Sequence, residues 1–320
     1  MTSDALLTDR RDRVLAAMAD ADLDVLVLGR QDDANFAAGM HRLWTAGTRP
    51  FGAGCIVVRS TGRTHVLSSW DAGLPATMSV DDLYPATWNP RIMAGYLAEV
   101  PGLSTARRIG VDEVSPSFAR AAARIAPGAT VVPADDVIAA ARCRKAPEEI
   151  ELIRQSCAVA RMGVEAVLKD PSDGIARAII AMAAQGATIP SSAPSARSLP
   201  DGFTIDIGVI VDGYEGGIGG RFIAAGRVSR SKLPAACRAG ATHRDLTLAA
   251  TDANWLVRGL GMGFEKPVMN TRLGTGQVLE QGMVLSVSDG EHRDVVLVTA
   301  GEPEVLSIAR AEETVERRES

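Results

Sequence analysis

The stretch TIDIGVIVDGYEGGIGGRF, residues 204–222, decides the fold of the second half of the chain. Two β-rich runs flank Asp212 and Gly213, a dipeptide that strongly favours a tight hairpin turn. The first run carries one carboxylate, Asp206, among apolar neighbours, and the second run is rich in glycine. The stretch therefore predicts a buried hairpin in which a single aspartate faces a strand with few side chains.

Residues 1–140 alternate between strand and helix patterns. The strands are expected at 23–29, 54–60, 64–70, 108–113 and 129–135, with a hairpin signal at Thr61 and Gly62. Helices are expected from a cap at Thr8 to about residue 21, and at 91–100 and 117–125. This alternation is typical of an α/β domain, which we predict for residues 1–140.

The pattern changes near residue 142. The segment RKAPEEIELIRQSCAVARMGVEAVLKD, 144–170, opens with Pro147, Glu148 and Glu149, as a helix N-terminus does. Its apolar residues then fall on one helical face. Strand-rich segments follow with few helices between them, so residues 141–320 are predicted to form an α+β domain with an antiparallel sheet.

Composition excludes several classes of protein. The net charge of −5 gives no basic stripe for nucleic acid. The four cysteines have no paired spacing, which argues against a disulfide framework or a zinc knuckle and fits a reducing compartment. The N-terminus has no signal-peptide pattern, and no apolar run approaches the ~20 residues of a membrane span. We therefore expect a cytoplasmic protein that binds neither nucleic acid nor membranes.

Five segments in order give the chain a specific resemblance. They are residues 144–168, 203–222, 257–270, 279–290 and 294–307, and the first half adds DANFAAGM, 33–40, and RPFGAGCIVV, 49–58. Together they resemble the creatinase, aminopeptidase P and prolidase family. The resemblance implies a creatinase-like N-terminal α/β domain, residues 1–140, and a shortened pita-bread domain, residues 141–320. It also implies a homodimer, or a heteromer with an active relative.

Active metallopeptidases of that family hold two divalent ions with two aspartates, one histidine and two glutamates, and their bound water becomes the nucleophile. Carried over by position, the first aspartate is kept as Asp206. The other four positions hold Gly217, Arg258, Ser288 and Arg293, and a further family histidine aligns with Ser192. Because metal affinity needs several deprotonated ligands together, we predict no metal and no cofactor.

Asp206 still needs a partner if it is buried. A bidentate pair with guanidinium satisfies a carboxylate, so we predict that Arg258 or Arg293 lies within ion-pair reach, with Arg293 preferred because its strand is a neighbour. Asp206, Arg258, Arg293, Ser288 and Ser192 are the predicted ligand-binding residues. With two arginines against one aspartate, the expected ligand is a small anionic molecule or a peptide.

Asp289, Glu291, His292 and Asp294 are the one local group with metal-like composition. Strand alternation sends neighbouring side chains to opposite faces, so at most two of them can share a site. Asp289, Glu291 and His292 are the candidates for residual general acid–base catalysis. The first hypothesis is a binding protein that has lost metallopeptidase activity. A metal-independent hydrolase or lyase acting on a small amide or guanidino compound is the second, and an active Xaa-Pro peptidase is the third.

Overall fold

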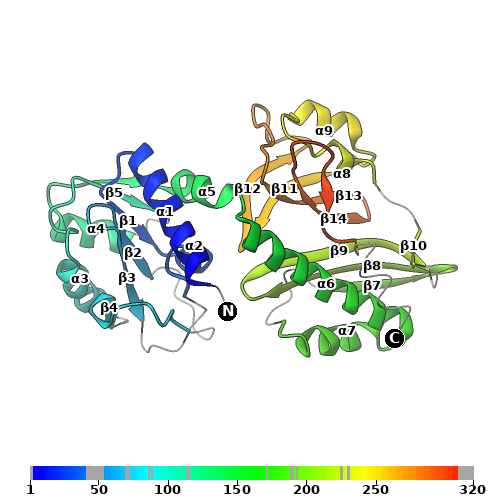
Figure 1. Ribbon diagram of the computed structural model, residues 1–320, viewed down its shortest axis with the longest axis horizontal. Coiled ribbons are helices and arrows are strands. Elements are labelled where there is room, and N and C mark those ends of the chain that lie inside the picture. Colours follow the sequence, from blue (N-terminus) through cyan, green and yellow to red (C-terminus); the bar gives the residue numbers. More distant parts are fainter. Residues whose placement is uncertain are drawn as a thin grey trace. The chain divides into compact units, whose positions relative to one another are not determined.

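The computed structural model divides the chain into two compact units, Met1–Arg142 and Cys143–Ser320 (Figure 1). It describes residues 3–40, 54–68, 73–85, 87, 89–112, 116–170, 172–187, 191, 194–223, 226–228 and 231–308. Within the described residues, no helix combines the length and the apolar character that crossing a bilayer requires.

The first unit is built on a mixed six-stranded sheet with the order β4-β3-β2-β1-β5-β6. Its strands are β1 (Val25–Leu28), β2 (Cys55–Val58), β3 (Arg63–Ser68), β4 (Leu83–Pro85), β5 (Arg108–Val111) and β6 (Thr130–Pro133). β2 is antiparallel to both β1 and β3, which confirms the predicted hairpin at Thr61 and Gly62. β5 runs parallel to β1 and β6, as strand–helix alternation predicts.

Helices pack against this sheet. They are α1 (Asp4–Asp20), α2 (Gln31–Ala38), α3 (Pro90–Glu99), α4 (Pro116–Ile125) and α5 (Asp135–Cys143), with a short 3-10 helix η1 (Val80–Asp82). Residues from α3 and α4 pack with Val25 and Val27 in one apolar core. The predicted cap at Thr8 is wrong: the cap of α1 lies five residues earlier, at Ser3, whose hydroxyl accepts a hydrogen bond from the Leu6 backbone N–H.

A buried ion pair joins α2 to α5. Arg142 contacts Asp33, and its Nη1 also donates to Asp32 Oδ2 at 2.9 Å. Asp33 is 2% exposed, and burial raises its pKa from 3.8 to about 7, against the opposing effect of Arg142. The folded state therefore binds more protons than the unfolded state between these two values.

We expect this aspartate to make stability fall as pH rises. Its contribution is fully present below pH 3.8 and is lost as pH rises through about 7. Replacing the titrating group with an amide, Asp33→Asn, should remove that trend, so the wild type should lose free energy of unfolding relative to the variant between pH 4 and pH 7. Urea denaturation across this range measures the difference, and the exposed Asp20→Asn serves as the control. Parallel pH profiles for wild type and Asp33→Asn would contradict the assignment.

The second unit is built on an antiparallel sheet with the order β12-β11-β13-β14-β9-β8-β7. Its long strands are β7 (Ser195–Leu199), β8 (Gly202–Val211), β9 (Tyr214–Ile223), β11 (Leu256–Gly261), β12 (Gly263–Asn270), β13 (Val284–Asp289) and β14 (His292–Leu297). The short strands β10 (Gly226–Arg227) and β15 (Glu304–Val305) pair with β9 and β14. This confirms the predicted antiparallel sheet.

β8 and β9 form the predicted hairpin. Asp212 and Gly213 have φ angles of 48° and 84°, the left-handed pair that a two-residue turn of this kind requires. The predicted long helix is α6 (Pro147–Lys169), which lies with α7 (Gly174–Ala183) along one face of β7, β8 and β9 (Figure 1). Ile205, Ile207 and Ile218 face these helices in an apolar core.

A second core lies toward the β11 end of the sheet. It contains Trp255, Leu285 and Val296 together with residues of α8 (Leu233–Ala236) and α9 (His243–Ala249). Side chains alternate strictly here: on β13 and β14 the residues of this core alternate with Ser286, Ser288 and Arg293, which point to the opposite side. One face of the sheet is thus more polar than the other, and Asp206 lies on this face.

Candidate functional site

The centre of the candidate site is an ion pair between Asp206 on β8 and Arg293 on β14. Arg293 Nε donates to Asp206 Oδ1 at 2.7 Å, and Nη2 lies 2.5 Å from the same oxygen. Asp206 and Arg293 both lie opposite Gly219 of β9 in the strand register, so the two side chains rise on the same side of the sheet. The predicted pairing of Asp206 with Arg293 is confirmed.

The glycines of β9 leave room for this pair. A Cβ atom at Gly217 would lie closer than 3.0 Å to the Arg293 guanidinium. At Gly219 a Cβ atom would lie 3.0 Å from Asp206 Oδ1 and 3.1 Å from Arg293 Cβ. The guanidinium therefore fills the space that a side chain at position 217 would enter. We call the side of the sheet that carries Asp206, Gly217, Gly219 and Arg293 the Asp206 face.

Arg258 of β11 has a different partner from the one considered in the sequence. Its Nη2 donates to Glu215 Oε1 at 2.6 Å, and its guanidinium carbon lies 5.1 Å from the centre of the Phe264 ring. Glu215 is 2% exposed and stands two residues before Gly217 on the same face of β9. Sequence reasoning missed Glu215, although its spacing of two from Gly217 was the available signal. Two carboxylates thus balance the two arginines.

The remaining predicted ligand residues are placed as follows. Ser288 lies directly opposite Arg293 in the β13–β14 register and shares its side of the sheet. Ser192 lies outside the described residues. The structure therefore brings Asp206, Arg293 and Ser288 onto one face, with Arg258 and Glu215 as a second pair on that face.

The three predicted acid–base candidates do not all come together in one site. Asp289 accepts hydrogen bonds from Ser231, Thr251 and the Asp252 backbone N–H, so it holds two loops. Burial opposes its ionisation, but these donors prevail and lower its pKa. Glu291 forms an exposed ion pair with Arg197 at 2.7 Å.

His292 and Asp294 point away from the Asp206 face. His292 lies opposite Asp289 in the strand register, and Asp294 is paired with Arg227 at 2.6 Å. The group with metal-like composition is thus divided among several local structures. Among the described residues, no cluster of three or more histidine, cysteine, aspartate or glutamate side chains could hold a metal ion.

Two divalent metals of the kind that the resemblance implies do not fit the Asp206 face. A cation there would meet Asp206, whose Oδ1 is taken by the Arg293 guanidinium, and Glu215, which Arg258 already pairs. The Arg293 guanidinium also occupies the space beside Gly217. Divalent metal sites need several anionic ligands converging on one point. The face can instead offer hydrogen bonds: the Asp206 side chain is 41% exposed, against 10% for Arg293.

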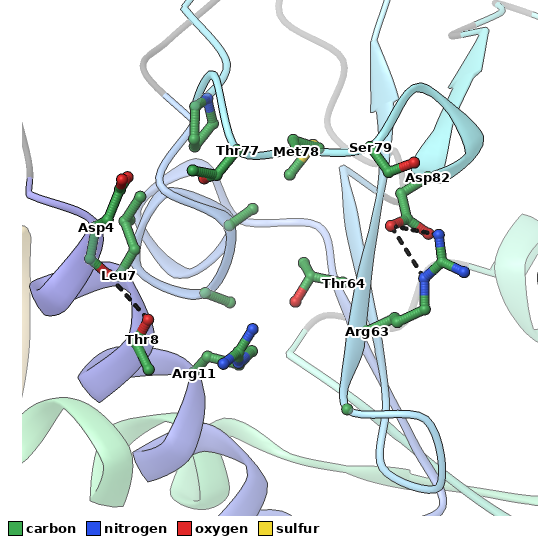
Figure 2. A pocket seen from close by; sticks show the side chains of 14 residues that line it. Asp4, Leu7, Thr8, Arg11, Arg63, Thr64, Thr77, Met78, Ser79 and Asp82 are labelled. Carbon is green, nitrogen blue, oxygen red and sulfur yellow. Dashed lines mark hydrogen bonds and ion pairs between the residues drawn. The ribbon is translucent and has the colours of Figure 1, made fainter.

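A separate pocket of about 350 Å³ lies in the first unit, between α1, α2, β3 and the segment before β4 (Figure 2). On one wall, Arg63 Nε and Nη2 donate to Asp82 Oδ2 at 3.1 and 2.9 Å (Figure 2). His65 Nδ1 lies 2.9 Å from Asp82 Oδ1, and burial lowers the pKa of His65. Asp82 thus joins η1 to β3 through its contacts with Arg63 and His65, so this wall of the pocket has a structural role.

The comparisons with known proteins agree with this architecture. Residues 10–144 match the family model of the Creatinase/Prolidase N-terminal domain. The prolidase from Pyrococcus furiosus is similar in structure, with a TM-score of 0.67 and 19% identity over 93% of this chain and 99% of that one. The prolidase from Pyrococcus horikoshii OT3 gives a TM-score of 0.70 and 14% identity over 95% and 99%.

The Xaa-Pro dipeptidase from Bacillus anthracis gives a TM-score of 0.68 and 17% identity over 95% of this chain and 98% of that one. At such identities the likeness establishes the fold, a creatinase-like α/β domain followed by a pita-bread domain, and leaves the chemistry to the site. No curated protein sequence matches the chain.

Proposed function

We propose that the chain is a member of the creatinase, aminopeptidase P and prolidase family whose pita-bread sheet binds a ligand without metal-dependent hydrolysis. Residues 10–144 match the Creatinase/Prolidase N-terminal domain, and the whole chain has the fold of the solved prolidases. The ligand we favour is a short peptide, held by its N-terminal ammonium on the Asp206 face.

The ion pair between Asp206 and Arg293 carries this proposal. In a two-metal hydrolase the cations neutralise the acidic ligands and supply the activated water. Here a fixed guanidinium neutralises Asp206 with two contacts to Oδ1, at 2.7 and 2.5 Å. A guanidinium provides no coordinated water and does not give up its proton in proteins. The pair therefore supports binding and gives no route to an activated nucleophile.

The contacts of the two carboxylates favour an ammonium over an anion. No described residue donates a hydrogen bond to Asp206 Oδ2, and the side chain is 41% exposed. Arg258 and Arg293 are each committed to a carboxylate and are 14% and 10% exposed. An anionic ligand would have to compete for guanidinium groups already in use, whereas an ammonium group needs no rearrangement to reach Oδ2.

Binding of alanyl-proline tests this proposal against its N-acetyl derivative, which lacks the ammonium. We expect calorimetry to detect the free dipeptide and to find at least roughly tenfold weaker binding of the acetylated one, since a hydrogen bond between charged groups contributes about 1.5–3 kcal/mol. The Asp206→Asn substitution should weaken binding of the free dipeptide to the same extent.

The control for this experiment is Asp201→Asn, which changes an exposed aspartate in the turn between β7 and β8 that pairs with Arg221 of β9. Binding should stay within about twofold of the wild type, as for a surface charge with a small contribution. Equal affinity for both forms of the dipeptide, or tighter binding of small carboxylates than of either, would refute the ammonium site. The predicted homodimer, or heteromer with an active relative, stays a prediction that sedimentation can test.

A further inference from the structure

A pocket of about 650 Å³ lies in the second unit, between α8, the segment 300–305 and β14. Its apolar walls come from Pro234 and Ala235 on one side and Pro303 and Val305 on the other. Asp294 also lines it. Because Asp294 follows Arg293 directly on β14, its side chain points to the opposite side of the sheet from the Asp206 face. The pocket is thus separate from the candidate site described above.

Asp294 is a buried carboxylate with one oxygen in use. It is 2% exposed, and its Oδ1 accepts from Arg227 Nη1 at 2.6 Å and from Ser307 Oγ at 2.7 Å. No described residue donates a hydrogen bond to Oδ2. A carboxylate oxygen can accept two hydrogen bonds. Asp294 lines the pocket and its Oδ2 is not sealed inside the protein, so this oxygen can accept a hydrogen bond from a molecule inside the pocket.

The other polar groups of the pocket do not supply this donor. The Ser231 hydroxyl donates to Asp289 Oδ2 at 2.5 Å, and the side chains of Arg238 and Glu302 are exposed. Arg227 already donates with Nη1 to Oδ1 and with Nη2 to the Gly219 carbonyl oxygen. Glu302 and Arg238 bring opposite charges to the exposed part of the lining, so Asp294 is the one buried charged group that faces the pocket among its described lining residues.

We propose that this pocket binds a small aliphatic amine, with the ammonium group donating to Asp294 Oδ2 and the hydrocarbon part lying against Pro234, Pro303 and Val305. A charged donor makes the stronger hydrogen bond to a carboxylate, roughly twice that of a neutral one. The pocket volume falls within the ~300–1,000 Å³ of small-molecule sites, and apolar walls around a few polar groups are their usual composition.

Three probes with one hydrocarbon body and different head groups test the proposal: 3-methylbutylamine, 3-methylbutanol and 3-methylbutanoate. Titration of the whole ¹⁵N-labelled chain, followed by NMR, should show saturable shifts at residues lining the pocket for the amine. The alcohol should bind at least tenfold more weakly and the carboxylate should not bind. Equal affinity for amine and alcohol, or preference for the carboxylate, would overturn the assignment.

Variants locate the binding and separate it from the Asp206 face. Asp294→Asn should weaken amine binding at least tenfold. Ala300→Phe, at an exposed lining position, should block amine binding while leaving Asp294 and its partners in place. The matched control is Ala239→Phe, which changes an exposed alanine outside the lining. Asp206→Asn should leave the amine-induced shifts at the pocket residues unchanged, so their loss in that variant would place the amine on the Asp206 face and refute the pocket. Retained binding in Ala300→Phe would also refute it.

Discussion

The purified protein, supplied with excess Mn²⁺ or Co²⁺, should hydrolyse Xaa-Pro dipeptides no faster than buffer with the same metal. A two-metal hydrolase works by generating a bound hydroxide and by stabilising the developing oxyanion, and the loss of one electrostatic element of an active site commonly costs ~10²–10³ in rate. If the resemblance assigns the ligand positions correctly, four of the five hold Gly217, Arg258, Ser288 and Arg293. The expected loss therefore reaches the uncatalysed background.

The measurement is a panel of Xaa-Pro dipeptides and guanidino compounds, assayed with each metal beside an active prolidase as the positive control. Elemental analysis of the same preparation should find no stoichiometric manganese, iron, cobalt or zinc. Metal-stimulated turnover that exceeds the buffer rate, or metal retained in proportion to protein and lost in Asp206→Asn, would reverse the conclusion.

The fold was largely predictable because its signals are local. The hairpin at Asp212 and Gly213 follows from turn chemistry, and the start of α6 follows from Pro147 and the acidic residues after it. The error at Thr8 has an equally local cause. Ser3 and Thr8 can both cap a helix, and α1 gains a further apolar contact at Leu6, which is 3% exposed, by starting at the earlier position.

The part of the site formed by Asp206 and Arg293 was predictable because the order of neighbouring strands determines it. Arg293 and Asp206 meet because β14 and β8 flank β9, and both residues stand opposite Gly219. Glu215 was missed because a search for metal-ligand positions passes over a residue between the turn and the first glycine. Its pairing with Arg258 depends on how β9 and β11 approach each other across the sheet, and no residue spacing in one chain segment encodes that distance.

Including Glu215 changes the charge balance of the Asp206 face more than including any other residue. Counted from the sequence, two arginines faced one aspartate and predicted an anionic ligand. With Glu215 included, the four charged side chains balance, and the group most open to solvent is the Asp206 carboxylate, at 41% exposed. The choice between an anionic and a cationic ligand group therefore depended on one buried glutamate.

Replacing Arg258 with methionine should destabilise the protein by about 3–5 kcal/mol, the usual cost of leaving one partner of a buried ion pair uncompensated. The Glu215 side chain is 3% exposed, and among the described residues Arg258 is its one ion-pair partner. Methionine keeps much of the apolar stem that lies against Phe264, so the loss of stability comes mainly from the missing charge. Chemical denaturation of the variant and the wild type gives the difference.

A double variant separates the charge effect from the loss of packing. Glu215→Gln combined with Arg258→Met removes both charges and should recover most of the lost stability, because no ion then stays buried without a partner. The matched control is Arg197→Met, which breaks a pair with Glu291 that is 68% and 49% exposed and should cost only about 0–1 kcal/mol. Two results would contradict a stabilising role for the pair between Glu215 and Arg258. One is a loss of stability in Arg258→Met no larger than in Arg197→Met. The other is a double variant no more stable than Arg258→Met.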